Sequence, residues 1–201
     1  MYRIMHSRIL LCAILIMIMF AKSFGFDKYE VECREDLLDK SEKVLFSQLH
    51  TVENHENKGK KINKYLSSVG LSPGHPYCAA GQYFCFYKAS KELSLDESKI
   101  PLYKTGLANL IYNKAVTKGR RSVPVPQKHD LVVWRLPRSW KGHIERVIKT
   151  GEAGWIQTIG FNVTKNIKGR KKEGVFKKRR NIYHPLGRML VRGLIGFKKN
   201  K

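Results

Sequence analysis

The sequence predicts an α+β domain in which helices come first and an antiparallel β-sheet follows. Before Pro126, apolar residues recur three and four residues apart, as on one face of a helix. After Pro126, short segments rich in Val, Ile and aromatic residues are separated by Gly, Pro or charged residues, which is typical of strands. Successive runs of helices and strands indicate the α+β class. The hydrophobic content of 42% supplies enough apolar side chains for a packed core.

Apolar periodicity predicts four helical segments, and β-type composition predicts four strands. The third helix begins at Cys78, directly after the turn-rich loop Ser72–Pro76, and Pro76 is well placed just ahead of a first helical turn. The predicted helical segments are 33–52, 62–69, 78–93 and 107–111, and the predicted strands contain the segments DLVVWRL, GHIERVI, GWIQTIG and GVFKKRR.

Residues 1–25 have the features of a signal peptide. Arg3 and Arg8 give a positive start, an apolar run extends from Ile9 to Ala21, and small and polar residues follow up to Gly25. The run is shorter than the ~20 apolar residues that a membrane-spanning helix needs. We therefore expect an exported protein, periplasmic or secreted, with an uncleaved N-terminal anchor as the alternative.

Removal of the signal peptide would leave Cys33, Cys78 and Cys85, an odd number of thiols in a compartment that permits disulfides. Cys78 opens a predicted helix, where the positive end of the backbone dipole favours a thiolate. Cys85 lies about 10 Å further along that helix, beyond the ~7 Å between Cα atoms that a disulfide allows. Cys78 is therefore a candidate nucleophile, with a buried inert thiol as the alternative. We expect Cys85 in the core and leave Cys33 open.

His143 and Asn162 are candidate partners for Cys78. His143 follows Gly142 at the start of a predicted strand, which places its ring at the rim of a sheet, and Asn162 follows the next strand. An asparagine can accept a hydrogen bond from an imidazole N–H and so orient the ring. The order Cys, His, Asn repeats the arrangement of Cys-His-Asn peptidases. The alternative for His143 is an exposed or hydrogen-bonded histidine without a catalytic role.

Several segments, taken in order, resemble CHAP domains (cysteine, histidine-dependent amidohydrolases/peptidases), which are relatives of the NlpC-type enzymes. The stretch KYLSSVGLSPGHPYCAAGQYFC resembles their nucleophile segment, and DLVVWRLP resembles the strand before the catalytic histidine. GHIERVI resembles their GHxGxV strand, GWIQTIGFN the segment that ends in EGN, and GVFKKRRNIYHPLGRM the basic last strand of a bacterial branch. The similarity extends from about Lys58 to Phe197.

The resemblance implies a catalytic Cys78 nucleophile, a His143 base and an Asn162 that orients the base. It implies a papain-like CHAP fold, in which the nucleophile at a helix start packs on a small antiparallel β-sheet. The implied activity is hydrolysis of amide bonds in bacterial peptidoglycan through a thiol acyl-enzyme. The expected parts of the chain are a signal peptide at 1–25, an N-terminal helical extension at 26–57 and a CHAP-like catalytic domain with a basic C-terminal tail at 58–201.

No cofactor or metal is expected, because the sequence has no HExxH motif and no His or Cys pair at zinc-like spacing. Trp140 and Glu145 are candidate substrate-binding residues. We place Trp140 at the rim of the groove and Trp134 in the core.

Five positions depart from the CHAP pattern. The pattern has a small residue at Glu145 and a carboxylate at Gly160. Glu145 shares a strand face with His143, so it either substitutes for the missing carboxylate or blocks the cleft. The other departures are an apolar position at Arg146, a glycine at His129 and a larger side chain at Gly81. They motivate the alternative of a catalytically impaired descendant that only binds cell wall or anionic surfaces.

The formal net charge is +23, and the loss of Arg3, Arg8 and Lys22 would leave +20. From Lys165 to Lys201 there are fourteen Lys and Arg residues and one acid, Glu173. Such an excess favours attraction to a polyanion, with a solvated face as the alternative. The expected partners are peptidoglycan and, through the basic tail, anionic wall polymers or a membrane surface. Nucleic acid is not expected outside the cell, although a basic nucleic-acid or membrane-active protein remains a third hypothesis.

Overall fold

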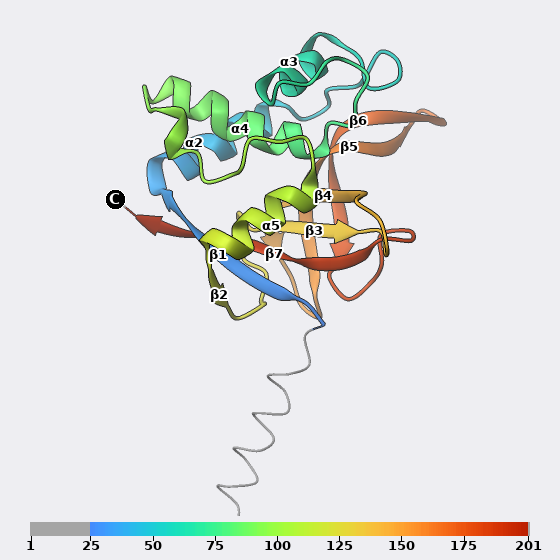
Figure 1. Ribbon diagram of the computed structural model, residues 1–201. Coiled ribbons are helices and arrows are strands. Elements are labelled where there is room, and N and C mark those ends of the chain that lie inside the picture. The colour runs from blue at the N-terminus through green and yellow to red at the C-terminus, as the bar shows by residue number, and fades with distance from the viewer. Residues whose placement is uncertain (1–24, 201) are drawn as a thin grey trace, which may run out of the picture.

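The computed structural model describes residues 25–200 (Figure 1). Except for Gly25, the predicted signal peptide lies outside the described residues. Within them, the fold is mixed α+β, with four α-helices and a seven-stranded sheet. None of the helices in this range is long and apolar enough to cross a membrane.

The helices and strands fall into two groups along the chain, as the sequence predicts, with one exception at the start. The helices are α2 (Glu35–Ser47), α3 (Lys60–Ser68), α4 (Cys78–Glu92), α5 (Ala108–Lys118) and the short 3-10 helix η1 (Glu97–Lys99). The strands are β1 (Asp27–Arg34), β2 (Arg120–Ser122), β3 (Leu131–Arg135), β4 (Gly142–Thr150), β5 (Trp155–Ile167), β6 (Arg170–Asn181) and β7 (Leu190–Asn200).

The sheet is larger than the small antiparallel one that we expected. Its strand order is β2-β1-β7-β3-β4-β5-β6, and β1 runs parallel to β7 while the other neighbours are antiparallel. The prediction missed β1 because it began a helix at Cys33. Tyr29, Val31 and Cys33 alternate with polar residues, which is the two-residue period of a strand, and the helix begins only at Glu35.

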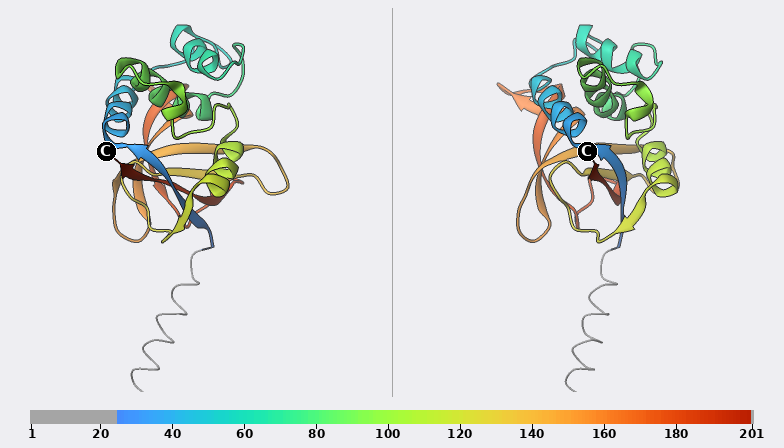
Figure 2. Two further views of the ribbon diagram at one scale, coloured as in Figure 1. Left: turned by 60° about the vertical axis from the view of Figure 1, so that its left-hand side comes forward. Right: turned by 90° about the vertical axis from the view of Figure 1, so that its left-hand side faces the viewer.

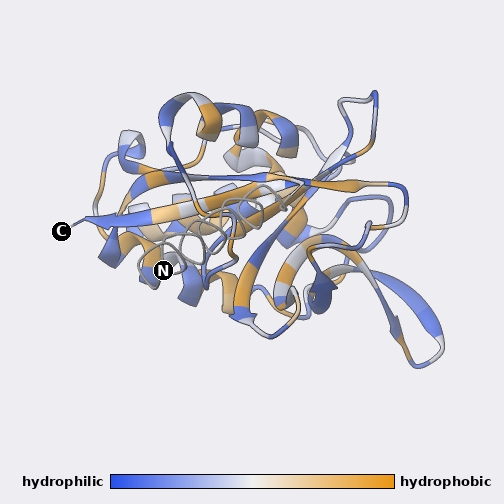
Figure 3. Ribbon diagram, turned by 90° about the horizontal axis from the view of Figure 1, so that it is seen from below, coloured by the Kyte–Doolittle hydropathy of each residue, from blue (hydrophilic) through white to orange (hydrophobic). Residues whose placement is uncertain are grey.

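The segment 26–57 is built into the same fold as the rest of the chain. Val31 and Leu37 belong to one hydrophobic core with Cys78 and Ile195, and a buried ion pair of 2.9 Å joins Lys28 to Asp130. The expected basic tail is likewise mostly strand, because the residues from Lys165 to Asn200 complete β5 and form β6 and β7. Near the chain end marked C, β7 becomes hydrophilic (Figure 3).

Helices α2, α3 and α4 gather at one end of the curled sheet, and α5 lies against it separately (Figures 1 and 2). Helix α4 is the central one, with ten of its fifteen residues buried. Buried Gln82 in α4 donates a hydrogen bond of 3.2 Å to the carbonyl of Ile159 in β5. Packing and this contact fix the start of α4 beside strands β4 and β5.

Candidate active site

Cys78 is the first residue of α4, as the sequence predicts, and is 6% exposed. No side chain caps the helix at Tyr77, so the positive end of the backbone dipole is directed at the thiol region. All three cysteines in the described part of the chain are free. Cys85 is in the core, where its thiol donates to the Gly81 carbonyl, and Cys33 is buried as well. Burial raises the pKa of both Cys33 and Cys85 to about 12, which leaves them as inert thiols.

The structure brings His143 to Cys78. His143 is the second residue of β4, is 8% exposed and packs against Trp134 on the neighbouring strand. Burial alone would lower the pKa of His143, but hydrogen bonding to the Cys78 thiol and to Glu145 outweighs it and raises the pKa to about 10. The Nε2 atom lies 3.0 Å from a Glu145 oxygen, so Nδ1 is the ring nitrogen left for the thiol.

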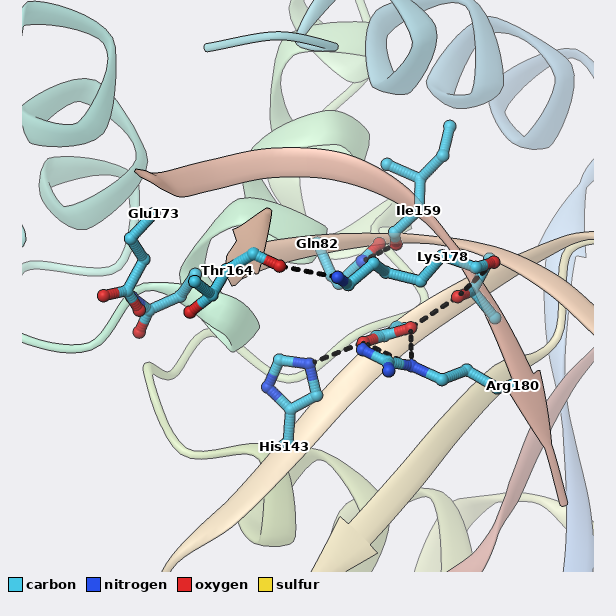
Figure 4. Close-up of polar contacts among 10 residues, drawn as sticks. Gln82, His143, Ile159, Thr164, Glu173, Lys178 and Arg180 are labelled. Atoms are coloured by element: carbon cyan, nitrogen blue, oxygen red, sulfur yellow. Dashed lines mark hydrogen bonds and ion pairs between the residues drawn. The ribbon is translucent and has the colours of Figure 1, made fainter. Parts of the chain in front are cut away.

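Glu145 is fully buried behind His143, two residues along the same strand. Arg180 donates to both carboxylate oxygens at 2.6–3.2 Å, and the Thr158 hydroxyl donates to one of them. Figure 4 shows dashed lines from the labelled His143 ring and Arg180 guanidinium to a carboxylate, which the contact distances identify as that of Glu145. Burial would raise the pKa of Glu145, but hydrogen bonds from His143 and Arg180 lower it to about 2. Of the two alternatives for Glu145, the geometry matches the substitute carboxylate, since the side chain does not reach the surface of a cleft.

The hydrogen bonds of the Asn162 side chain go to Tyr77, the residue before Cys78, and to Asn57 and Glu173, and none goes to His143. Asn162 occupies the β-bulge of β5 with a φ of 58°, in the left-handed region that asparagine tolerates. Its side-chain oxygen accepts from the Tyr77 N–H at 3.3 Å, and its amide donates to Asn57 and Glu173. These contacts hold the loop that leads into Cys78, while Glu145 contacts the imidazole.

The predicted substrate-binding tryptophan Trp140 is 69% exposed in the β3–β4 loop, whereas Trp134 is buried at 1% exposure, as expected. The carbonyl of Trp140 accepts a hydrogen bond of 2.9 Å from Asn109, which fixes the loop but leaves the indole in solvent. Trp140 is not among the residues that line the hollow beside His143.

A hollow of about 300 Å³ opens beside His143. It combines cationic side chains with an apolar wall. Its other lining residues are Asn162, Val163, Thr164, Lys178, Arg180, Leu186 and Met189.

Lys178 and Arg180 were not predicted to belong to the site. They lie in the run KKRR, which reads as a uniformly basic surface. The alternation of side chains along a strand could have identified them. Lys178 and Arg180 are two residues apart in β6 and therefore share one face, and that face meets His143 and Glu145.

Two of the departures from the CHAP pattern are explained by packing. A Cβ atom on Gly81 would lie 2.2 Å from the Phe161 ring, so the ring fills the space of a larger side chain at position 81. Arg146 is fully buried, where its guanidinium donates to Ser41 and Leu38 and lies over the Phe86 ring.

The backbone explains a third departure. His129 has a φ of 78°, a conformation that glycine adopts without strain.

The arrangement places a thiol, an imidazole and a buried carboxylate in series, which are the types of group that thiol acyl transfer requires. Among residues 25–200, no group of three or more His, Cys, Asp or Glu side chains is placed to hold a metal ion. Comparison with known protein families, curated proteins and solved structures finds no match for this chain.

Proposed function

We propose that this protein is an exported cysteine amidohydrolase or peptidase that cleaves amide bonds in bacterial peptidoglycan. The observation that carries the proposal is the buried relay from Cys78 through His143 to Glu145 and Arg180. Residues of three separate elements, α4, β4 and β6, meet there. A histidine used only for packing would not need a carboxylate that is itself held by an arginine.

The reaction begins with attack of the Cys78 sulfur on the carbonyl carbon of the substrate amide. The tetrahedral oxyanion accepts a hydrogen bond from the Cys78 backbone N–H at the start of α4. As the C–N bond breaks, the His143 imidazolium donates its proton to the departing amine and a thioester remains. Water then gives a proton to His143 and its oxygen to the acyl carbon, which releases the acid and restores the thiol.

The family and the substrate rest on sequence resemblance. The CHAP pattern has a small residue at 145 and a carboxylate at 160, and this chain has Glu145 and Gly160. These two positions are paired across β4 and β5, so the exchange keeps one carboxylate in the same place. This exchange supports an active papain-like CHAP domain. The predicted signal peptide and the positive charge support export to a wall rich in anionic polymers.

The test is hydrolysis of purified cell wall in a gel assay. Wild-type protein is expected to clear the wall, and Cys78→Ser and His143→Ala are expected to abolish clearing while the folded state is retained by circular dichroism. Clearing by Cys78→Ser would overturn the proposal.

One observation favours a binding-only descendant, namely the low exposure of Cys78 and His143, at 6% and 8%. That alternative predicts wall binding by the wild type without any clearing and without new amino groups in the wall. Co-sedimentation with wall, run beside the gel assay, separates the two functions.

A further inference from the structure

The hollow beside His143 has an excess of positive charge. His143, Lys178 and Arg180 line it, and no acidic side chain does. Two of these three cations, His143 and Arg180, form ion pairs with the same buried carboxylate, Glu145. Glu173 is not among the lining residues and accepts a hydrogen bond from the Asn162 amide.

Lys178 is the cation in this group that has no carboxylate partner among the described residues. Its ammonium group donates to the Thr164 carbonyl, and the side chain is partly buried rather than extended into solvent. An ammonium group beside a neutral carbonyl still has two N–H donors to offer. Burial and the nearby Arg180 lower the pKa of Lys178, so an anion that enters the hollow would relieve an unfavourable charge.

The position of Lys178 fits recognition of a substrate group. Lys178 pairs with Thr158 across β5 and β6, and Thr158 contacts the same Glu145 that holds His143. Leu186 and Met189, which meet in a β-bridge, form the apolar wall of the hollow. A ligand that suits this lining has an anionic group beside a small aliphatic side chain.

We propose that Lys178 is a specificity-determining residue, which binds a free carboxylate of the substrate next to the amide bond that is cleaved. This inference rests on the proposed function and narrows its substrate class to peptides with an unamidated carboxylate close to the scissile bond. Lys178 touches the substrate but takes no part in proton transfer.

The first test compares alkylation of Cys78 by iodoacetate, which carries a carboxylate, and by iodoacetamide, which is neutral. Site-specific rates are measured by peptide mass spectrometry on the intact protein. Lys178→Gln is expected to slow iodoacetate about 3- to 10-fold more than it slows iodoacetamide, which is the effect of one nearby charge in a partly solvated site. Lys178→Arg is expected to retain the iodoacetate rate.

Lys177→Gln is the matched control, because it removes the same charge from the next residue, whose side chain lies over Phe46. The inference would be overturned if Lys178→Gln slowed both reagents equally. It would also be overturned if Lys177→Gln lost as much selectivity for iodoacetate as Lys178→Gln does. So would a wild-type Cys78 that neither reagent labels.

The second test uses muropeptides that differ only in amidation of the carboxyl group beside the cleaved bond. The wild type is expected to prefer the free acid through a lower KM, and Lys178→Gln to lose that preference through a higher KM for the free acid. If the wild type cleaves both peptides equally, the inference fails while the proposed hydrolase stands. If it cleaves neither, and wall clearing is also absent, the proposed function fails.

Discussion

Glu145 lies directly opposite Gly160 in the antiparallel pair of strands β4 and β5, and it occupies the space that a side chain at 160 would need. A Cβ atom at 160 would come within 2.9 Å of the Glu145 carboxyl carbon and 2.7 Å of Val163. The two positions therefore form one unit, in which only one member can carry a large side chain.

This pairing predicts strong coupling between substitutions at the two sites. Gly160→Glu alone is expected to destabilise the fold by about 2–4 kcal/mol, through overpacking and a second buried carboxylate. Glu145→Gly alone is expected to cost a similar amount because Arg180 and His143 lose their partner. The double variant Glu145→Gly with Gly160→Glu should be destabilised less than the sum of the two single variants, by at least ~1 kcal/mol of unfolding free energy. Urea unfolding of the four proteins measures this, and simple additivity would contradict the shared-space argument.

The ion pair between His143 and Glu145 predicts a definite pH window. The raised pKa of His143 contributes stability that is complete below its ordinary value of 6.5 and is lost as pH rises toward about 10. The lowered pKa of Glu145 contributes stability that is present above 4.5 and is lost as pH falls toward about 2. The difference in unfolding free energy between wild type and Glu145→Gln is expected to be about 3 kcal/mol. It should be greatest between pH 4.5 and 6.5. Glu152→Gln, at an exposed turn, is the control and should show a small, flat difference.

The contact between Gly81 and the Phe161 ring predicts a packing defect with a specific rescue. Gly81→Ala is expected to lower the unfolding free energy by about 1–3 kcal/mol, although alanine is the better helix former, because the new methyl overlaps the ring. Adding Phe161→Leu should restore part of that loss. A stabilised Gly81→Ala protein in thermal melts would show that the ring moves aside freely.

Reactivity should distinguish the three cysteines. Cys78 lies at a helix start beside the His143 imidazolium, whereas the pKa of Cys33 and of Cys85 is raised to about 12 by burial. Iodoacetamide at pH 6 is therefore expected to label Cys78 at least about tenfold faster than the other two in the folded protein. His143→Ala should slow this labelling, because the cation beside the sulfur is removed. If no cysteine is labelled in the folded protein and all three are labelled equally in urea, Cys78 is inaccessible in the folded state.

The projecting β5–β6 hairpin predicts salt-sensitive attachment to anionic polymers. Lys165 lies directly opposite Lys172, a like-charge pair that costs stability unless a polyanion neutralises it. Binding to wall is expected to fall steeply as salt rises, because the Debye length decreases from ~10 Å at 0.1 M to ~3 Å at 1 M. Lys165→Gln with Lys172→Gln should weaken co-sedimentation at low salt and raise the thermal midpoint. Binding that does not change with salt would argue for a non-electrostatic contact.

The sequence predicted the helices, strands β3 to β6 and the position of Cys78 at a helix start, because these depend on local patterns. Periodicity and the loop before Pro76 act within a few residues. The parallel pairing of β1 with β7 joins residues more than 160 positions apart, such as Asp27 and Gly193, and no local pattern specifies such a partner. Strands β1, β2 and β7 were therefore not predicted, and the end of β1 at Cys33 was assigned to the following helix.

The site was predictable only in part for the same reason. His143 was found because a motif surrounds it, and Glu145 was identified as one of two alternatives from its strand face. The choice between a substitute carboxylate and a blocked cleft needed the contact with Arg180, which lies 35 residues further along the chain. In the sequence, nothing distinguishes Arg180 from the other basic residues beside it. Burial decides that Arg180 binds a carboxylate while Lys177 faces a ring, and burial follows from tertiary structure.

The central position of β7 has a consequence for how the chain folds. This strand, Leu190–Asn200, joins β1 on one side to β3 on the other, so without it the sheet is divided into two parts. Pairing of strands so distant in sequence is slow to form, because the closure of a long loop precedes any favourable contact. While the chain is being synthesised, Cys78 would therefore lie on an incomplete framework until β7 has been made. The finished surroundings of the thiol would thus be among the last parts of the fold to form.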